Sequence, residues 1–164
     1  MELKIKRLAA EEFDIAYKLI WPVFMEYEAP VYPERGVESF REFLYGGSIE
    51  KRYEEGFYTM LLCLADGIPA AAGGMRDGNH ISLLFTKTEY QRHGIGRMLI
   101  SEFERIAGEQ GYRSMTVNAS PYGIPFYKAV GFREAGMESC ADGIVYTPMI
   151  KMIKRSDIHG KNNT

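Results

Sequence analysis

Cysteines, long apolar runs and an excess of one charge are all scarce in this sequence. Only Cys63 and Cys140 among its 164 residues are cysteines, and their spacing suits neither a metal site nor a disulfide framework. No apolar run approaches the roughly 20 residues of a membrane span, and the N-terminal residues lack the apolar core of a signal peptide. With 20 basic and 22 acidic residues the formal charge is −2, so neither nucleic acid nor an anionic membrane is an expected partner. These absences predict a cytoplasmic protein without a metal ion.

What the sequence does contain is typical of one globular domain. Hydrophobic residues make up 46% of the chain and charged residues 26%, and the length suffices for one sizeable core. We therefore predict a single domain over residues 1–155, followed by a flexible polar tail at 156–164.

The hydrophobic pattern predicts a succession of helices and strands. In chain order we expect a strand at 3–8, helices at 11–27 and 37–47, one or two helical turns within 49–55, strands at 57–65, 68–75 and 81–86, a helix from 95 to 108–111, a strand at 115–118, a short helix around Tyr127, and a closing hairpin of 132–139 with 144–153. Two prolines predict irregularities. Pro22 is expected to kink or divide the first helix, and Pro148 to place a bulge or a sheet edge in the last strand.

The loop Gln91-Arg92-His93-Gly94-Ile95-Gly96 lies where the strand at 81–86 gives way to a helix. The first amides of a helix have no partner inside the helix, and the helix dipole adds positive potential there. Glycines allow the backbone to approach an anion without an intervening Cβ. The loop therefore predicts an anion site, although glycines at such a junction also serve simply to form a turn.

Spacing excludes two familiar phosphate loops. A dinucleotide site requires a third glycine where this sequence has Leu99, and an acidic residue about 20 positions further on, where none occurs. A nucleotide-triphosphate loop ends in Gly-Lys-Ser/Thr, whereas this loop ends in Gly96-Arg97-Met98. The pattern that remains, Q-x-x-G-x-G, resembles the pyrophosphate loop of the GNAT superfamily of acetyl-CoA-dependent N-acetyltransferases.

A second stretch carries the same resemblance. Residues 120–132 read Ser-Pro-Tyr-Gly-Ile-Pro-Phe-Tyr-Lys-Ala-Val-Gly-Phe, which resembles the family's other signature, a short helix that carries a tyrosine and ends in Gly-Phe. The two signatures stand in the family's order, and the resemblance covers Leu3 to Ile153. It implies the α+β GNAT acyl-CoA N-acyltransferase fold, a central and mostly antiparallel mixed sheet flanked by helices. In that fold the strands at 83–86 and 116–119 splay apart, and acetyl-CoA lies in the gap.

The resemblance also implies roles for individual residues. Tyr127 corresponds to the usual general acid, and the backbone of Phe85 and Thr86 to the groups that pair with the pantetheine arm of acetyl-CoA. The pyrophosphate is expected to bind at Gln91, Arg92, His93, Gly94, Ile95, Gly96 and Arg97. This sequence departs from the family at Thr88, which replaces a proline, and at Ser120, which replaces the asparagine expected to contact pantetheine.

The acceptor side is less clearly marked. His80 and Ser82 stand where the arylalkylamine branch of the family carries two histidines that relay a proton, so His80 is a candidate base. A lone histidine at a strand start is more often structural. Glu26, Glu28 and Tyr32 are candidates for binding the amine, with a solvated helix end as the alternative.

We therefore predict an N-acetyltransferase that transfers the acetyl group of acetyl-CoA directly to an amine, either a small molecule or a peptide. A cationic acceptor is expected, because carboxylates and aromatic rings both attract an ammonium group. The alternatives are a degenerate acyl-CoA-binding regulatory domain and acyl transfer to a non-amine acceptor. The chain is expected to act alone or as a homodimer.

Overall fold

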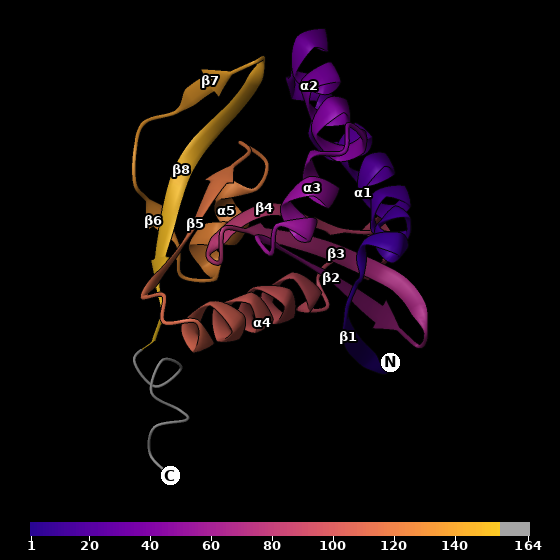
Figure 1. The fold of residues 1–164 in the computed structure, drawn as a ribbon. Helices are drawn as coiled ribbons and strands as arrows, with labels where there is room; N and C mark the ends of the chain where they lie inside the picture. The colour runs from indigo at the N-terminus through magenta and orange to yellow at the C-terminus, as the bar shows by residue number, and fades with distance from the viewer. Residues whose placement is uncertain (155–164) are drawn as a thin grey trace.

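The computed structural model describes residues 1–154, so the tail predicted at 156–164 lies outside the described residues. Within them, a sheet of eight strands crosses the molecule between two sets of helices (Figure 1). The strands are β1 (Leu3–Arg7), β2 (Tyr58–Ala65), β3 (Ile68–Arg76), β4 (His80–Thr86), β5 (Ser114–Ala119), β6 (Arg133–Glu134), β7 (Ser139–Ala141) and β8 (Ile144–Met152). Their order is β1-β2-β3-β4-β5-β8-β6, with β7 also paired to β8. Every pair is antiparallel except that of β4 with β5.

Helices cover both faces of this sheet (Figure 1). They are α1 (Phe13–Tyr27), α2 (Glu34–Tyr45), α3 (Ser48–Glu54), α4 (Ile95–Glu109) and α5 (Ile124–Ala129), with single 3₁₀ turns at Ala10–Glu12, Ala29–Val31 and Thr88–Tyr90. One apolar core, which includes Phe103, lies beneath α4 and α5, and a second, which includes Phe24, lies beneath α1, α2 and α3. No helix within residues 1–154 is long and apolar enough to cross a bilayer.

Strands β4 and β5 are paired only between the first two residues of β4 and the middle of β5. Their parallel register joins His80 to Thr116 and Ile81 to Val117, and no further pairing between them is found in the described chain. Residues 82–86 therefore leave their backbone groups on the β5 side without a strand partner. The splay predicted between 83–86 and 116–119 is confirmed, and it opens the space in which the candidate site lies.

One extra residue in β4 reverses the direction of its side chains. In the antiparallel register with β3, Met75 lies opposite Ile81 and Gly74 lies opposite Leu83, so Ser82 forms a β-bulge. Ile81 consequently packs in the core beneath α4, whereas Leu83 packs in the core beneath α1. Through this bulge a single strand contributes apolar side chains to both cores.

Most of the predicted elements are present, and two details differ. Helix α1 continues without division through Pro22, because this proline lies on the exposed face, where the unpaired carbonyl of Lys18 is solvated. The strand predicted at 132–139 is reduced to the short β6 and β7, which pair with different parts of β8. Pro148 forms no bulge, because it pairs regularly with Asn118 of β5, but on its other side it lies in the gap between the β6 and β7 pairings, a local edge of the kind predicted.

Candidate active site

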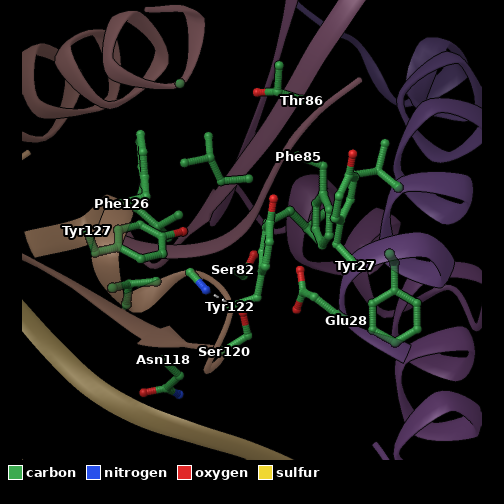
Figure 2. Close-up of a pocket in the computed structure, with 18 of the residues that line it drawn as sticks. Tyr27, Glu28, Ser82, Phe85, Thr86, Asn118, Ser120, Tyr122, Phe126 and Tyr127 are labelled. Carbon is green, nitrogen blue, oxygen red and sulfur yellow. Dashed lines mark hydrogen bonds between the residues drawn. The ribbon is translucent and has the colours of Figure 1, made fainter. Parts of the chain in front are cut away.

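A cleft of about 1090 Å³ lies where β4 and β5 separate (Figure 2). Its volume is at the top of the about 300–1,000 Å³ typical of a site for one small ligand, so it suits two reactants. Most of the residues predicted to form the site line it, namely Glu28, Tyr32, His80, Phe85, Thr86, Gln91, Arg92, Gly94, Ile95, Gly96, Arg97, Ser120 and Tyr127. Two predicted residues, Glu26 and His93, do not line the cleft.

The loop before α4 places free backbone amides at one end of the cleft. Arg92 and Gly94 adopt left-handed backbone conformations, with φ of 66° and 78°, which turn the chain sharply into the helix. Among residues 1–154, no acceptor pairs with the amides of Ile95, Gly96 or Arg97. Since the helix dipole adds positive potential at these amides, this end of the cleft is suited to an anion.

The side chains around this loop differ in what they contact. The Gln91 side-chain amide donates a hydrogen bond to the Thr86 carbonyl at 3.1 Å, which ties the loop to the end of β4. The exposed guanidinium groups of Arg92 and Arg97 lie at the cleft, where they are placed to neutralise a phosphate. His93 is exposed and lies outside the cleft, so the structure gives no support to the phosphate contact expected of it.

Tyr127, on α5, forms part of the cleft wall (Figure 2). Its side chain is 7% exposed and packs edge-on against Phe126 and Phe132, with ring centroids 5.2 and 5.3 Å away. Burial and the nearby Glu28 carboxylate raise the pKa of Tyr127, so its hydroxyl group stays protonated at neutral pH. A protonated phenol in this position is able to donate a proton to a departing group.

Glu28 follows the last residue of α1 and places a half-buried carboxyl group in the cleft (Figure 2). Burial raises the pKa of Glu28 to about 7, and hydrogen bonds from the hydroxyl groups of Ser120 and Tyr32 keep it from rising further. A carboxyl group with this pKa gains and loses a proton near neutral pH, as a general base must. The residue predicted only to bind the amine therefore has the properties of a base.

Ser120 and Glu26 lie in different surroundings. Ser120 lines the cleft, and its hydroxyl accepts a hydrogen bond from the Gly123 amide at 3.1 Å. The pantetheine contact expected of it stays a prediction. Glu26 accepts a hydrogen bond from Thr88 at 3.2 Å in a separate shallow pocket, because residues two apart at a helix end point in nearly opposite directions. This position removes Glu26 from the amine site.

His80 lies at the closed end of the splay, where β4 and β5 are still paired. Its Nδ1 is 2.8 Å from the Thr116 hydroxyl oxygen. Burial, and then the charge of Arg76, lower the pKa of His80 to about 4, so its ring is neutral at pH 7. His80 faces the cleft, but it takes a proton from an ammonium group far less readily than Glu28 does. Within residues 1–154, no group of three or more His, Cys, Asp or Glu side chains is arranged to hold a metal ion.

An aromatic pair that the sequence analysis did not identify joins the two walls of the cleft. Tyr27 of α1 stacks on Tyr122 of the β5–α5 loop, with ring centroids 5.1 Å apart and an interplanar angle of 23° (Figure 2). The Tyr27 hydroxyl is also 2.8 Å from the Thr88 hydroxyl. The available signal in the sequence was the place of Tyr122 within the second signature, residues 120–132, whereas Tyr27 carries no such mark.

The splayed strands, the free α4 amides and the tyrosine helix occur together in one cleft, as the two signatures predict. A family model described as an acetyltransferase (GNAT) domain matches residues 28–153. The chain belongs to the GNAT acetyltransferase family. The matched region contains both signatures and Glu28, while the whole of α1 precedes it.

Individual GNAT proteins resemble the chain in sequence and in fold. A Bacillus subtilis protein named as an acetyltransferase is 26% identical over 100 residues, which make up 59% of this chain and 66% of that protein. The PaiA N-acetyltransferase of Thermoplasma acidophilum, crystallised with coenzyme A, has a TM-score of 0.76 and 20% identity, covering 93% of this chain and 99% of that one. A GCN5-related N-acetyltransferase of Rhodopseudomonas palustris has a TM-score of 0.74 and 20% identity, covering 93% and 96%. These likenesses confirm the predicted GNAT fold.

Proposed function

We propose that this GNAT protein transfers the acetyl group of acetyl-CoA directly to an amine, with Glu28 as general base and Tyr127 as general acid. One observation carries the proposal. The same cleft contains a carboxyl group with a pKa of about 7 and a protonated, buried phenol. Acetyl transfer to an amine uses both groups, because a proton must leave the attacking ammonium and another must reach the departing thiolate.

The cleft also suits acetyl-CoA as the donor. The free amides of residues 95–97, together with Arg92 and Arg97, match the charge of a pyrophosphate. The unpaired side of β4 over residues 82–86 is able to pair with the amide groups of the pantetheine arm, as an added strand does. Amides on the same strand edge are suited to stabilise the oxyanion that forms on the thioester carbonyl.

A base is needed because alkyl amines are almost fully protonated at neutral pH. With a pKa of about 10.4, only about 0.04% of such an amine is neutral at pH 7, which corresponds to about 4.6 kcal/mol. Burial raises the pKa of Glu28 to about 7. This value is closer to the pKa of the amine than the pKa of an exposed carboxyl group is. The environment of Glu28 therefore favours proton removal from the substrate.

The reaction then proceeds in balanced steps. The ammonium group gives one proton to Glu28, and the nitrogen lone pair forms a bond to the thioester carbonyl carbon. The carbon–sulfur bond breaks, and the sulfur leaves with its electron pair and takes the Tyr127 proton. The resulting phenolate removes the second proton from the new amide nitrogen, while Glu28 releases its proton to water.

The proposal is tested with purified protein, acetyl-CoA and a mixture of amines. We expect release of free thiol together with acetylated amine detected by mass spectrometry. Tyr127→Phe retains the ring and removes only the hydroxyl group, so it should reduce turnover about 10²-fold or more while leaving the affinity for acetyl-CoA unchanged. Calorimetric binding of acetyl-CoA without thiol release for any amine would overturn the proposal and indicate a binding module.

A further inference from the structure

Aromatic rings line the part of the cleft formed by α1, α2, the segment between them, β4 and β8. Six of them, which we call the aromatic chamber, are Phe24, Tyr32, Phe40, Phe43, Phe85 and Tyr146. Phe40 is central, with its ring centroid 4.0 Å from that of Phe24 and 5.8 Å from that of Phe85. Phe24, Phe40 and Phe85 are buried, so the ring surface left to cover an apolar group belongs mainly to the partly exposed Tyr32, Phe43 and Tyr146. Each apolar square ångström that a ligand removes from water there contributes about 25 cal/mol.

Negative charge in the cleft is confined to two side chains. Glu28 and Asp142 are the only acidic residues among the described residues that line it. Asp142 is paired with Arg35 at 3.1 Å, so Glu28 alone is available to an ammonium group. A second ammonium group in the chamber would gain cation–π attraction of about 0.5–2 kcal/mol from the rings, but it would lose hydration without meeting a free carboxylate, which costs more.

The chamber is closed at one end by a contact between α2 and the turn that joins β7 to β8. The Ser39 hydroxyl donates to the Asp142 carbonyl at 2.6 Å. The two backbones approach so closely that a Cβ placed on Gly36 would clash with the Gly143 carbonyl oxygen. Figure 1 shows the tip of this hairpin beside α2. We call this contact the α2–hairpin bridge, and it ties the α2 wall of the chamber to its β8 wall.

We propose that the acceptor is a compact monoamine with an apolar alkyl or aryl body, rather than a polyamine or a peptide lysine. Its ammonium group contacts Glu28, and its body is covered by the aromatic chamber beneath the α2–hairpin bridge. This inference rests on the amine acetylation proposed above, and it adds the substrate class to it.

The test compares amines that differ in one property. Hexylamine and 1,5-diaminopentane have the same number of non-hydrogen atoms and differ by a terminal methyl or ammonium group. A tripeptide with a central lysine and blocked ends represents a peptide acceptor. We expect kcat/KM for hexylamine to exceed that for both others by about 10- to 100-fold, because hexylamine places a terminal methyl group in the chamber where the diamine must place an ammonium group, and because the peptide backbone cannot be covered there.

Variants of the chamber should change this preference. Phe43→Asp adds a second carboxylate and should shift the hexylamine-to-diamine ratio of kcat/KM at least tenfold toward the diamine. Phe43→Leu is the matched control and should retain the preference for hexylamine. Ile144→Asp adds a carboxylate from β8, which also lines the cleft, and serves where Phe43→Asp fails to fold.

A binding measurement separates the inference from the proposed function. In the presence of acetyl-CoA, hexylamine at high concentration should raise the melting temperature more than 1,5-diaminopentane does. Equal or better turnover of the diamine or the tripeptide overturns the inference and leaves amine acetylation standing. If no amine is acetylated, the proposed function fails, and the inference about its acceptor fails with it. Stabilisation by hexylamine in that case would indicate only a cleft that binds amines.

Discussion

Replacing Glu28 with glutamine gives the sharpest test of the chemistry. Glutamine has nearly the same size and can still bond to Ser120 and Tyr32, but it cannot accept a proton from an ammonium group. Burial raises the pKa of Glu28 from 4.5 to about 7, which lowers the cost of that proton transfer by about 3.4 kcal/mol. We therefore expect Glu28→Gln to lower kcat/KM for the amine about 10²- to 10⁴-fold at pH 7.

The pH dependence of this loss identifies its cause. The active form of Glu28 is the carboxylate, so wild-type kcat/KM should fall about tenfold per pH unit below pH 7 and level off above it. The variant depends on amine that is already neutral, and that fraction grows about tenfold per pH unit between pH 7 and 9. The ratio of the wild-type kcat/KM to that of Glu28→Gln should therefore decrease as the pH rises.

The assay is the initial rate of thiol release from acetyl-CoA at subsaturating amine, from pH 6 to 9. Glu26→Gln is the matched control, because Glu26 lies two residues away and outside the cleft, and it should follow the wild-type profile. A loss in Glu28→Gln that is equal at every pH would refute the assignment of a base and leave Glu28 as a binding charge. Wild-type activity in the variant at pH 7 would remove Glu28 from the mechanism altogether.

Three further predictions concern the other parts of the molecule. Gly96→Asp should abolish acetyl-CoA binding in calorimetry, whereas Gly96→Asn should weaken it only partly. Both variants add a side chain of the same size near Phe126, but only aspartate adds negative charge. Equal effects of the two variants would argue against an anion site. His80→Gln should lower kcat/KM far less than the about 10²-fold expected for a general base, because the pKa of His80 is about 4, and a larger loss measured at pH 7 would reinstate His80 as the base. The buried Glu104 carboxylate lies 2.9 Å from the Lys151 ammonium group, so Lys151→Met leaves it without a charge partner and should lower the unfolding free energy in urea titrations by about 3 kcal/mol. Adding Glu104→Gln to this variant should restore most of the lost stability. No restoration would contradict the pairing.

The anion loop and the tyrosine helix were predictable from the sequence because both are local. Glycines that turn the chain into α4, and a tyrosine followed by Gly131-Phe132, depend on neighbouring residues and leave a recognisable pattern. The splay of β4 and β5 came from the resemblance rather than from periodicity. No alternation of side chains reveals where two parallel strands stop pairing.

The acceptor side was not predictable, because its contacts join residues far apart in the chain. The choice between Glu26 and Glu28 depends on where α1 ends and on a hydrogen bond from Ser120. The α2–hairpin bridge likewise includes the pair of Arg35 and Asp142, which are separated by 107 positions. Such contacts arise from tertiary packing and have no signature in local composition.

The bulge at Ser82 also constrains how this protein can change over evolution. Because of the bulge, the alternation of side chains between the two faces of the sheet is reversed after Ser82. The two cores therefore share one strand of 7 residues, and the length of this strand has to be preserved. Deleting one residue of β4 would make the alternation of side chains regular along the whole strand. The apolar side chains on one side of the deletion would then point away from their core. Length variation among descendants of this chain should therefore accumulate in the loops and at the hairpin, whereas β4 should tolerate substitution but neither insertion nor deletion.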